Sequence, residues 1–123
     1  MSRIKSFTDL SAWKEAHGLV LMIYESTKRF PNEEKFGLVN QLRRAVVSIS
    51  SNIAEGFSRN TNKEKVQFYY TALGSLTEVQ NQLIISKDIT FLDKRQFEKL
   101  MQQVITVSKL LNGMIKSAKN MSR

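Results

Sequence analysis

The chain contains no cysteine and a single histidine, His17, among its 123 residues. Without cysteine it can form neither disulfides nor thiolate zinc sites, and it has no cysteine nucleophile. One histidine is too few for a His-rich metal site. The chain also has one proline and five glycines, which is little turn-forming material for a fold of many β-strands. We therefore expect an all-α protein.

Long uncharged apolar runs are also lacking, and residues 1–10 do not contain the apolar block of a secretory signal. We therefore expect a soluble, cytoplasmic protein that does not bind membranes. Hydrophobic residues make up 41% of the chain and charged residues 24%, a normal balance for a folded globular protein. The length predicts a single domain, residues 1–123.

Apolar residues recur at intervals of three and four in four stretches, which is the spacing of one face of an α-helix. The predicted helices span approximately residues 9–30, 33–58, 62–88 and 93–119. The positions expected in the core are Leu10, Trp13, His17, Val20, Tyr24 and Thr27, then Leu38, Leu42, Ala45, Ile49, Asn52 and Gly56, then Tyr69, Ala72, Leu76, Val79 and Leu83, and last Phe97, Leu100, Val104, Val107, Leu111, Met114 and Ala118. Short connections require antiparallel neighbours, so we expect an up-down-up-down four-helix bundle.

Signals at the predicted helix ends agree with this division. Thr61 is followed three residues later by Glu64, and Asp93 by Gln96. Both pairs fit the capping box, in which two side chains satisfy free backbone N–H groups at a helix start. Phe30-Pro31 marks the end of the first helix, because the residue before a proline avoids helical geometry.

The two central helices have more apolar surface than a lone bundle needs. Residues 45–54 and 66–77 contain no charge, whereas a helix of a monomeric bundle normally has one charged face. We therefore expect homo-oligomerisation; the alternative is a thick core with neutral polar residues facing water. The residues predicted at the oligomer interface are Val39, Val46, Val47, Ile53, Ala54, Phe57, Tyr70 and Leu73.

The net charge of +8 is concentrated near the C-terminus. Residues 92–123 contain seven bases and two acids, and no acid follows Glu98. Cations at near-heptad spacing form a stripe opposite the apolar seam of the last helix, which favours phosphate contacts. The alternative is a solvated face, since cations near a helix C-terminus are also stabilised by the helix dipole. The predicted nucleic-acid-binding residues are Arg95, Lys99, Lys109, Lys116, Lys119 and Arg123.

Signals of catalysis are weak, and we expect a protein that is not an enzyme and has no metal or cofactor. His17 has no glutamate three residues before it, as a carboxylate-bridged di-iron bundle would require. We expect it to be a partly buried packing residue. Glu55 and Glu78 could face each other as an acid–base pair, but ion pairing is the preferred interpretation, and Glu55 has the favourable i, i+4 spacing to Arg59. For Arg44 we prefer an ion pair with Glu55 or Glu78 over a role in nucleic-acid binding. Arg44, Asn52, Glu55 and Glu78 are therefore predicted as structural polar residues.

The run GLVNQLRRAVVSISSNIAEG, Gly37–Gly56, resembles the signature of the bacterial four-helix-bundle family often encoded in intervening sequences of large-subunit ribosomal RNA genes. The similarity extends to Trp13, to Phe30-Pro31 and to LGSLTEVQNQL, Leu73–Leu83. It implies a short antiparallel bundle that assembles into a ring-like homopentamer. The chain is also distantly similar to the accessory protein of diversity-generating retroelements, a basic pentamer that associates with reverse transcriptase and nucleic acid.

These observations lead to two expected functions. The first is a non-enzymatic, homo-oligomeric bundle that presents basic surfaces to RNA or DNA without sequence specificity, because no groove-reading motif is present. The alternative is an oligomeric scaffold whose partner is another protein, with the charge serving only solubility.

Overall fold

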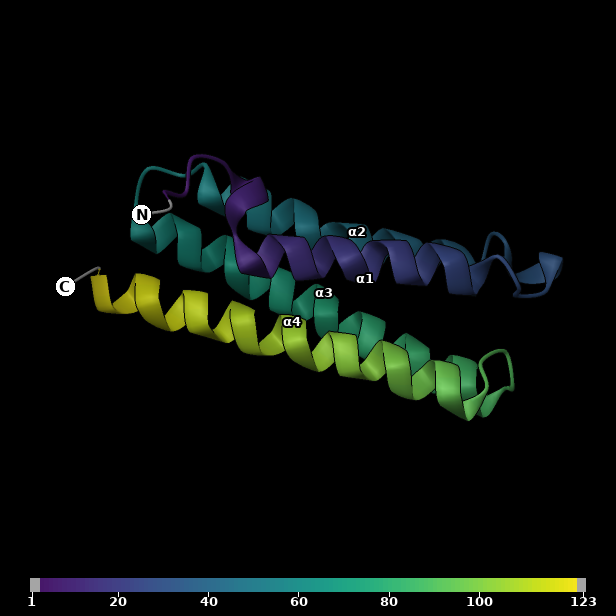
Figure 1. Cartoon of the computed structure of the whole chain (residues 1–123). Coiled ribbons are helices and arrows are strands. Elements are labelled where there is room, and N and C mark those ends of the chain that lie inside the picture. Colours follow the sequence, from purple (N-terminus) through teal and green to yellow (C-terminus); the bar gives the residue numbers. More distant parts are fainter. Residues whose placement is uncertain (1–2, 122–123) are drawn as a thin grey trace.

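The computed structural model describes residues 3–121, and every regular element in this range is a helix. The long helices are α1 (Ser11–Thr27), α2 (Leu38–Phe57), α3 (Asn62–Asp88) and α4 (Lys94–Met121). Two short 3-10 helices, η1 (Phe7–Asp9) and η2 (Asn32–Glu34), precede α1 and α2. Successive long helices run in opposite directions along one bundle (Figure 1). The predicted all-α, four-helix fold is confirmed.

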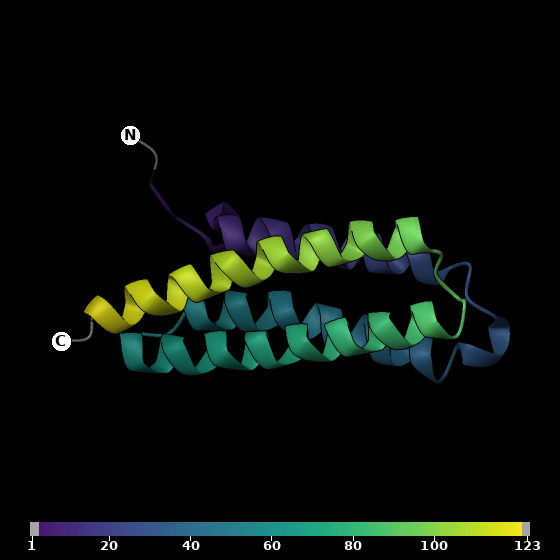
Figure 2. The ribbon, with the colours of Figure 1, turned by 90° about the horizontal axis from the view of Figure 1, so that it is seen from below.

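The four long helices form a square in cross-section. α1 packs against α2 and α4, and α3 packs against the same two helices, while within residues 3–121 the diagonal pairs do not approach each other. Figure 1 shows α1 and α2 above α4 and α3, and Figure 2 shows α3 and α4 side by side from below. The bundle therefore has four faces, which we name by the helices that border them: α1–α2, α2–α3, α3–α4 and α1–α4.

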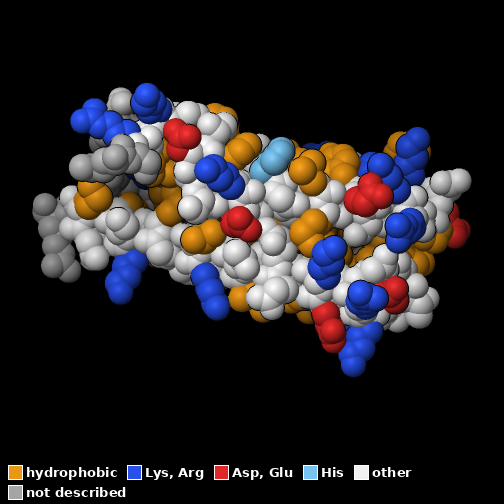
Figure 3. Space-filling view, viewed as in Figure 1, with side chains coloured by type: hydrophobic (Ala, Val, Ile, Leu, Met, Phe, Trp, Pro, Cys, Tyr) orange, Lys and Arg blue, Asp and Glu red, His pale blue; other side chains and the backbone are white. Residues whose placement is uncertain are grey.

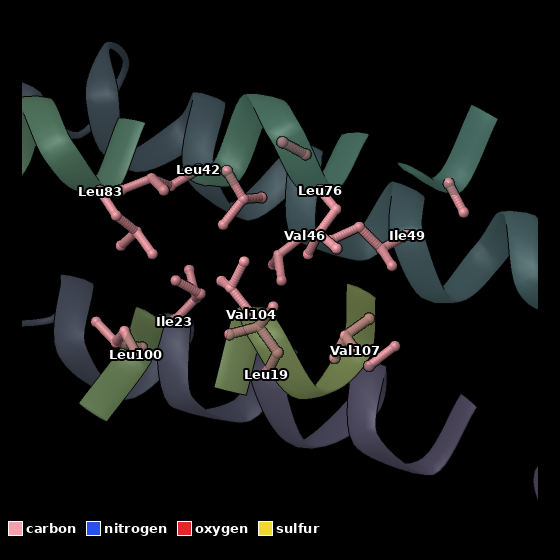
Figure 4. Close-up of a cluster of buried hydrophobic side chains, with 14 of the residues drawn as sticks. Leu19, Ile23, Leu42, Val46, Ile49, Leu76, Leu83, Leu100, Val104 and Val107 are labelled. Atoms are coloured by element: carbon pink, nitrogen blue, oxygen red, sulfur yellow. The ribbon is translucent and has the colours of Figure 1, made fainter. Parts of the chain in front are cut away.

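Aliphatic side chains from all four helices meet along the bundle axis (Figure 4). In α1 the buried positions are Ala12, Ala16, Leu19, Ile23 and Thr27, so the predicted register is off by one position except at Thr27. Of the other predicted positions, Leu10, Trp13 and Val20 pack partly buried against the core, and His17 and Tyr24 are exposed. The cause is a second apolar stripe on α1, formed by Trp13, Val20 and Tyr24, which lies beside the buried one. In α3 all five predicted core positions are buried.

Three residues predicted at an oligomer interface lie inside the bundle instead. Val46 and Ile53 have no exposed surface, and Val39 is 7% exposed; Figure 4 shows Val46 among the core side chains. They are covered because α2 packs against α1 on one side and α3 on the other, which buries a wide arc of its surface. The assignment of Val39, Val46 and Ile53 to a subunit interface was therefore wrong.

Local hydrogen bonds set the helix ends. Thr61 accepts a hydrogen bond from the Glu64 amide, and Asp93 and Gln96 cap each other reciprocally, as the capping boxes predicted. α2 begins at Leu38, five residues later than expected, because residues 32–34 form η2 and the Glu34 carboxylate then accepts from the Leu38 amide at 3.3 Å.

Gly56 lets α2 approach α3 closely. A Cβ atom at this position would lie 2.6 Å from Cε1 of Tyr69 and 3.0 Å from Cβ of Phe68. Tyr69 is buried, so its ring has no room to move away.

Within residues 3–121, none of the helices combines the length and the hydropathy that crossing a bilayer demands.

Candidate nucleic-acid interface and self-association faces

A line of cations, which we call the α4 ridge, follows the solvent side of the last helix. It comprises Arg95, Lys99, Lys109, Lys116 and Lys119, all exposed. None of them forms an ion pair within residues 3–121, where the two ion pairs join Lys28 to Glu25 and Lys87 to Asp88. Blue side chains project along the lower edge of the molecule, over α4, in Figure 3. The sixth residue predicted for this surface, Arg123, lies outside the described residues.

Lys119 differs from the rest of the ridge because it contacts α3. Its ammonium donates a hydrogen bond to the Tyr70 hydroxyl and lies 4.9 Å from the centre of the Tyr70 ring. The other four cations have no acceptor within residues 3–121 in any hydrogen bond found there. Their ammonium and guanidinium groups are therefore available to phosphate oxygens, which makes this ridge the candidate nucleic-acid interface.

The α1–α2 face combines apolar surface with uncharged stretches of both helices, and Arg43 and Arg44 line it beside Tyr24 and Val47. α1 carries no charged residue from Gly18 to Tyr24, and α2 carries none from Ala45 to Ala54. Tyr24 and Val47 are 38% and 39% exposed. Arg43 borders this face but its guanidinium is engaged, since it lies 4.5 Å from the centre of the Tyr24 ring and donates through Nε to Thr27 at 3.0 Å.

The α3–α4 face, on the opposite side of the bundle, has the same character. Its exposed apolar residues include Tyr70, Ile84 and Ile105. Tyr70 of α3 contacts Lys119 of α4, so these two residues mark the side where the helices meet. Ile84 follows Tyr70 by two heptads and Ile105 precedes Lys119 by two heptads. Residues at heptad spacing share one side of a helix, so Ile84 and Ile105 lie on this side as well. α4 carries no charge from Leu100 to Ser108.

The structure leaves some of the residues predicted for self-association at the surface and buries the others. Val47 and Tyr70 are exposed, and Ala54, Phe57 and Leu73 are partly exposed. Sequence reasoning missed Ile84 and Ile105, two exposed isoleucines of the α3–α4 face. Their positions outside the main apolar seam of each helix are the signal that could have identified them.

The polar residues predicted as structural behave differently from one another. Asn52 donates to the Ser48 carbonyl oxygen at 2.8 Å, which is a local structural role. Arg44 and Glu55 are exposed, and no ion pair joins Arg44 to Glu55 or Glu78 within residues 3–121. Glu55 does not pair with Arg59 within this range either, so the predicted ion pairs were wrong. Arg44 is left facing solvent beside Glu78 in a cleft on the α2–α3 face.

His17 is exposed instead of partly buried, because the core of α1 runs through Ala16 and Leu19. Its ring stacks on Trp13 with 4.8 Å between centres, and Phe7 meets the same indole edge-on. Across residues 3–121 no group of three or more histidine, aspartate or glutamate side chains is placed to hold a metal ion.

Within residues 3–121, one carboxyl group, that of Asp9, and one hydroxyl group, that of Tyr69, have shifted pKa values. The backbone N–H groups of Lys5 and Ser6, which donate to the Asp9 carboxylate at 2.9 and 3.1 Å, lower the pKa of Asp9. Burial raises the pKa of Tyr69. Both groups serve the fold, because Asp9 caps η1 and Tyr69 packs against α2.

The fold and these surfaces define a four-helix bundle, and comparison with known proteins identifies its family. The model of the family described as 23S rRNA-intervening sequence protein matches residues 8–113. The chain therefore belongs to the 23S rRNA-intervening sequence protein family, as the motif in Gly37–Gly56 predicted.

A solved structure shows the same fold. It is a crystal structure of a protein with unknown function from the S23 ribosomal protein family of Bacteroides thetaiotaomicron, with a TM-score of 0.79 and 23% identity. The match covers 85% of this chain and 98% of that chain. No curated protein matches the chain.

Proposed function

We propose that this protein is a non-enzymatic, homo-oligomeric bundle that binds RNA or DNA through the α4 ridge without reading its sequence. The observation that carries the proposal is the set of exposed cations on α4, four of which have no acceptor within residues 3–121. Each such cation can neutralise a phosphate and release a counterion, which makes binding salt-dependent. The ridge contains no aromatic residue, so duplex or structured nucleic acid suits it better than stacked single strands.

Self-association through the α1–α2 and α3–α4 faces is the second part of the proposal. Both faces expose apolar side chains along stretches of helix without charge, a combination typical of protein–protein contact surfaces. The two faces lie on opposite sides of the bundle, so the α1–α2 face of one subunit can contact the α3–α4 face of the next. Such a heterologous contact forms a closed ring when the rotation from one subunit to the next divides a full turn evenly. The family resemblance implies five subunits. Each subunit would add one ridge, so weak phosphate contacts would act together.

Salt-titrated binding to generic RNA and duplex DNA tests the first part. We expect the slope of log affinity against log salt to fall by about two when Lys109→Gln and Lys116→Gln are combined, since each cation lost removes about one released counterion. The double variant Lys14→Gln and Lys63→Gln removes the same charge from exposed positions on α1 and α3, and it should keep the slope.

Two outcomes would overturn the nucleic-acid proposal. One is an absence of binding to either polymer at low salt, which would favour the scaffold that binds another protein. The other is an equal loss of slope in both double variants, which would mean that the total charge, and not the α4 ridge, sets the affinity.

A further inference from the structure

A polar cleft of about 370 Å³ lies on the α2–α3 face, between the first half of α2 and the middle of α3. Its volume is at the lower end of the range of ligand pockets, roughly 300–1,000 Å³. α2 is diagonal to α4, so the cleft is on the other side of the bundle from the α4 ridge. It is lined by Phe36, Asn40, Gln41, Arg44, Ala45, Ser48, Ser75 and Glu78.

Opposite charges stand in this cleft without pairing. Arg44 and Glu78 are both exposed, and no ion pair joins them within residues 3–121. Glu78 receives one long hydrogen bond, 3.4 Å from Nε2 of Gln82. The guanidinium donors and most carboxylate lone pairs therefore remain free for a ligand, and the near-neutral total charge suits a polar ring better than a phosphate.

The wall behind these charges is an ordered chain of polar groups. Asn52 donates to Oγ of Ser48 at 3.1 Å, and Ser48 Oγ lies 2.9 Å from Oγ of Ser75. The Ser48 oxygen can accept two hydrogen bonds, so either serine can be the donor in the Ser48–Ser75 pair.

Gln82 belongs to a second polar group, because it contacts Gln41 and Glu78, which both line the cleft. It is only 5% exposed, and its Nε2 makes two long hydrogen bonds, to Gln41 and Glu78 at 3.5 and 3.4 Å. Those two oxygen neighbours fix the orientation of the amide, and its Oε1 has no hydrogen-bond donor among the described residues. A buried amide oxygen without a donor is uncommon in a packed core and marks a polar site whose network is open.

An aromatic ring stands at the rim of the cleft. Phe36 is 87% exposed, and its ring has one neighbour of note, the Lys35 ammonium at 5.7 Å. The flat face of such a ring is a stacking surface for a nucleobase.

We propose that this cleft binds a guanine base, supplied either by a free nucleotide or by an unpaired residue of an RNA strand. Guanine offers the acceptors O6 and N7 to a guanidinium, which Arg44 provides. It offers the donors N1–H and N2–H₂ to a carboxylate, which Glu78 provides. Phe36 stacks on the ring, and Asn40 and Gln41 supply amides at its edge. The site is separate from the α4 ridge and does not depend on phosphate binding there.

Calorimetric titration with guanosine, adenosine and uridine 5′-monophosphates tests the proposal. We expect guanosine monophosphate to bind most tightly. Glu78→Gln and Arg44→Lys should each weaken it about tenfold, because each removes one bidentate contact. Phe36→Ala should weaken all purine nucleotides. Glu55→Gln and Lys63→Gln, exposed charges of the same two helices outside the cleft, are the matched controls and should leave binding unchanged.

A second arm compares guanine-containing and uridine-only single-stranded RNA octamers, and it distinguishes a strand from a free nucleotide as the source of the base. The double variant Lys109→Gln and Lys116→Gln should keep nucleotide binding, because neither lysine lines the cleft. A failure of the α4 ridge proposal is thereby distinguished from a failure of the guanine proposal. The proposal is overturned if guanosine monophosphate does not bind at millimolar concentration, or binds no better than uridine monophosphate. It is equally overturned if Glu78→Gln and Arg44→Lys change the molar mass in light scattering and not nucleotide affinity, since the α2–α3 face would then be a contact between copies.

Discussion

The α-carbon of Gly56 in α2 faces the buried ring of Tyr69 in α3, so closely that a methyl group on Gly56 would lie 2.6 Å from the ring. Gly56→Ala forces the two helices apart or twists the ring. We expect a loss of about 1–2 kcal/mol in the free energy of unfolding, measured by urea denaturation, because overpacking outweighs the gain in helix propensity.

Gly113→Ala is the matched control for this substitution. Gly113 lies inside α4, and a Cβ there would meet no atom within 4 Å. The variant should gain about 0.5–1 kcal/mol from helix propensity alone. A similar effect of both substitutions would show that the approach of Gly56 to Tyr69 does not limit packing.

Arg43 joins α1 to α2 through the ring of Tyr24 and the hydroxyl of Thr27. Thr27 is buried and donates in turn to the Ile23 carbonyl oxygen at 2.7 Å. We expect Arg43→Ala to lower the free energy of unfolding by about 1–2 kcal/mol, from one hydrogen bond with a charged donor and one cation–π contact.

Arg59→Ala separates these two contributions. The Arg59 guanidinium lies over the Phe68 ring at the same 4.5 Å, but Arg59 is exposed and its guanidinium contacts no buried hydroxyl. Its removal should cost less than about 1 kcal/mol. Equal losses in thermal or urea unfolding would mean that the hydrogen bond to Thr27 contributes nothing.

Asp9 makes the N-terminal segment sensitive to acid. Because the folded pKa of Asp9 is lowered, its contribution to the stability of η1 is present above the unfolded value of 3.8 and is lost as the pH falls through the folded pKa. Phe7 in η1 packs on Trp13, the one tryptophan in the chain. We therefore expect tryptophan emission to change below about pH 4 while the helical circular dichroism of the bundle persists.

Asp9→Asn should abolish this acid transition, and it should show the altered emission already at neutral pH. The measurement is made in a His17→Gln background, since His17 also stacks on Trp13. A transition that survives in Asp9→Asn would assign it to another carboxyl group.

The α1–α2 and α3–α4 faces can be tested against each other. Val47→Glu disables the α1–α2 face and Ile105→Glu disables the α3–α4 face, and both residues are exposed, so neither substitution disturbs the core. If unlike faces meet, each variant alone is a monomer, and an equimolar mixture forms a one-to-one dimer through the remaining intact pair of faces. Size exclusion with light scattering gives the masses.

A different pattern would contradict the heterologous arrangement. If like faces meet, one variant stays assembled and the mixture forms no new species. A wild-type protein that is monomeric at micromolar concentration would remove the self-association proposal altogether.

Helix number, class and most helix ends follow directly from the sequence, because spacing and capping are local properties. The five core positions of α3 are all buried as predicted. α1 has two adjacent stripes, and the choice between Ala16–Leu19 and His17–Val20 depends on which stripe faces the bundle axis. The packing of α1 against α2 and α4 decides between the two stripes, and the local spacing of apolar residues gives no information about that packing.

The same limit applies to the candidate surfaces. The exposure of the α4 ridge could be predicted, because it lies opposite a single seam of seven apolar positions. The burial of Val46 and Ile53 could not, because it depends on how far α1 and α3 wrap around α2. The cleft at Arg44 and Glu78 could not be predicted from the sequence for a similar reason, because its walls come from both α2 and α3.

The scarcity of ion pairs has a practical consequence for experiments. The two within residues 3–121 are both on the surface, and exposed pairs of this kind contribute little to stability. The bundle should therefore tolerate wide changes in ionic strength, from dilute buffer to about 1 M salt, where electrostatic attraction is largely screened. Any loss of partner that accompanies such a change then reports on the surface, and not on unfolding.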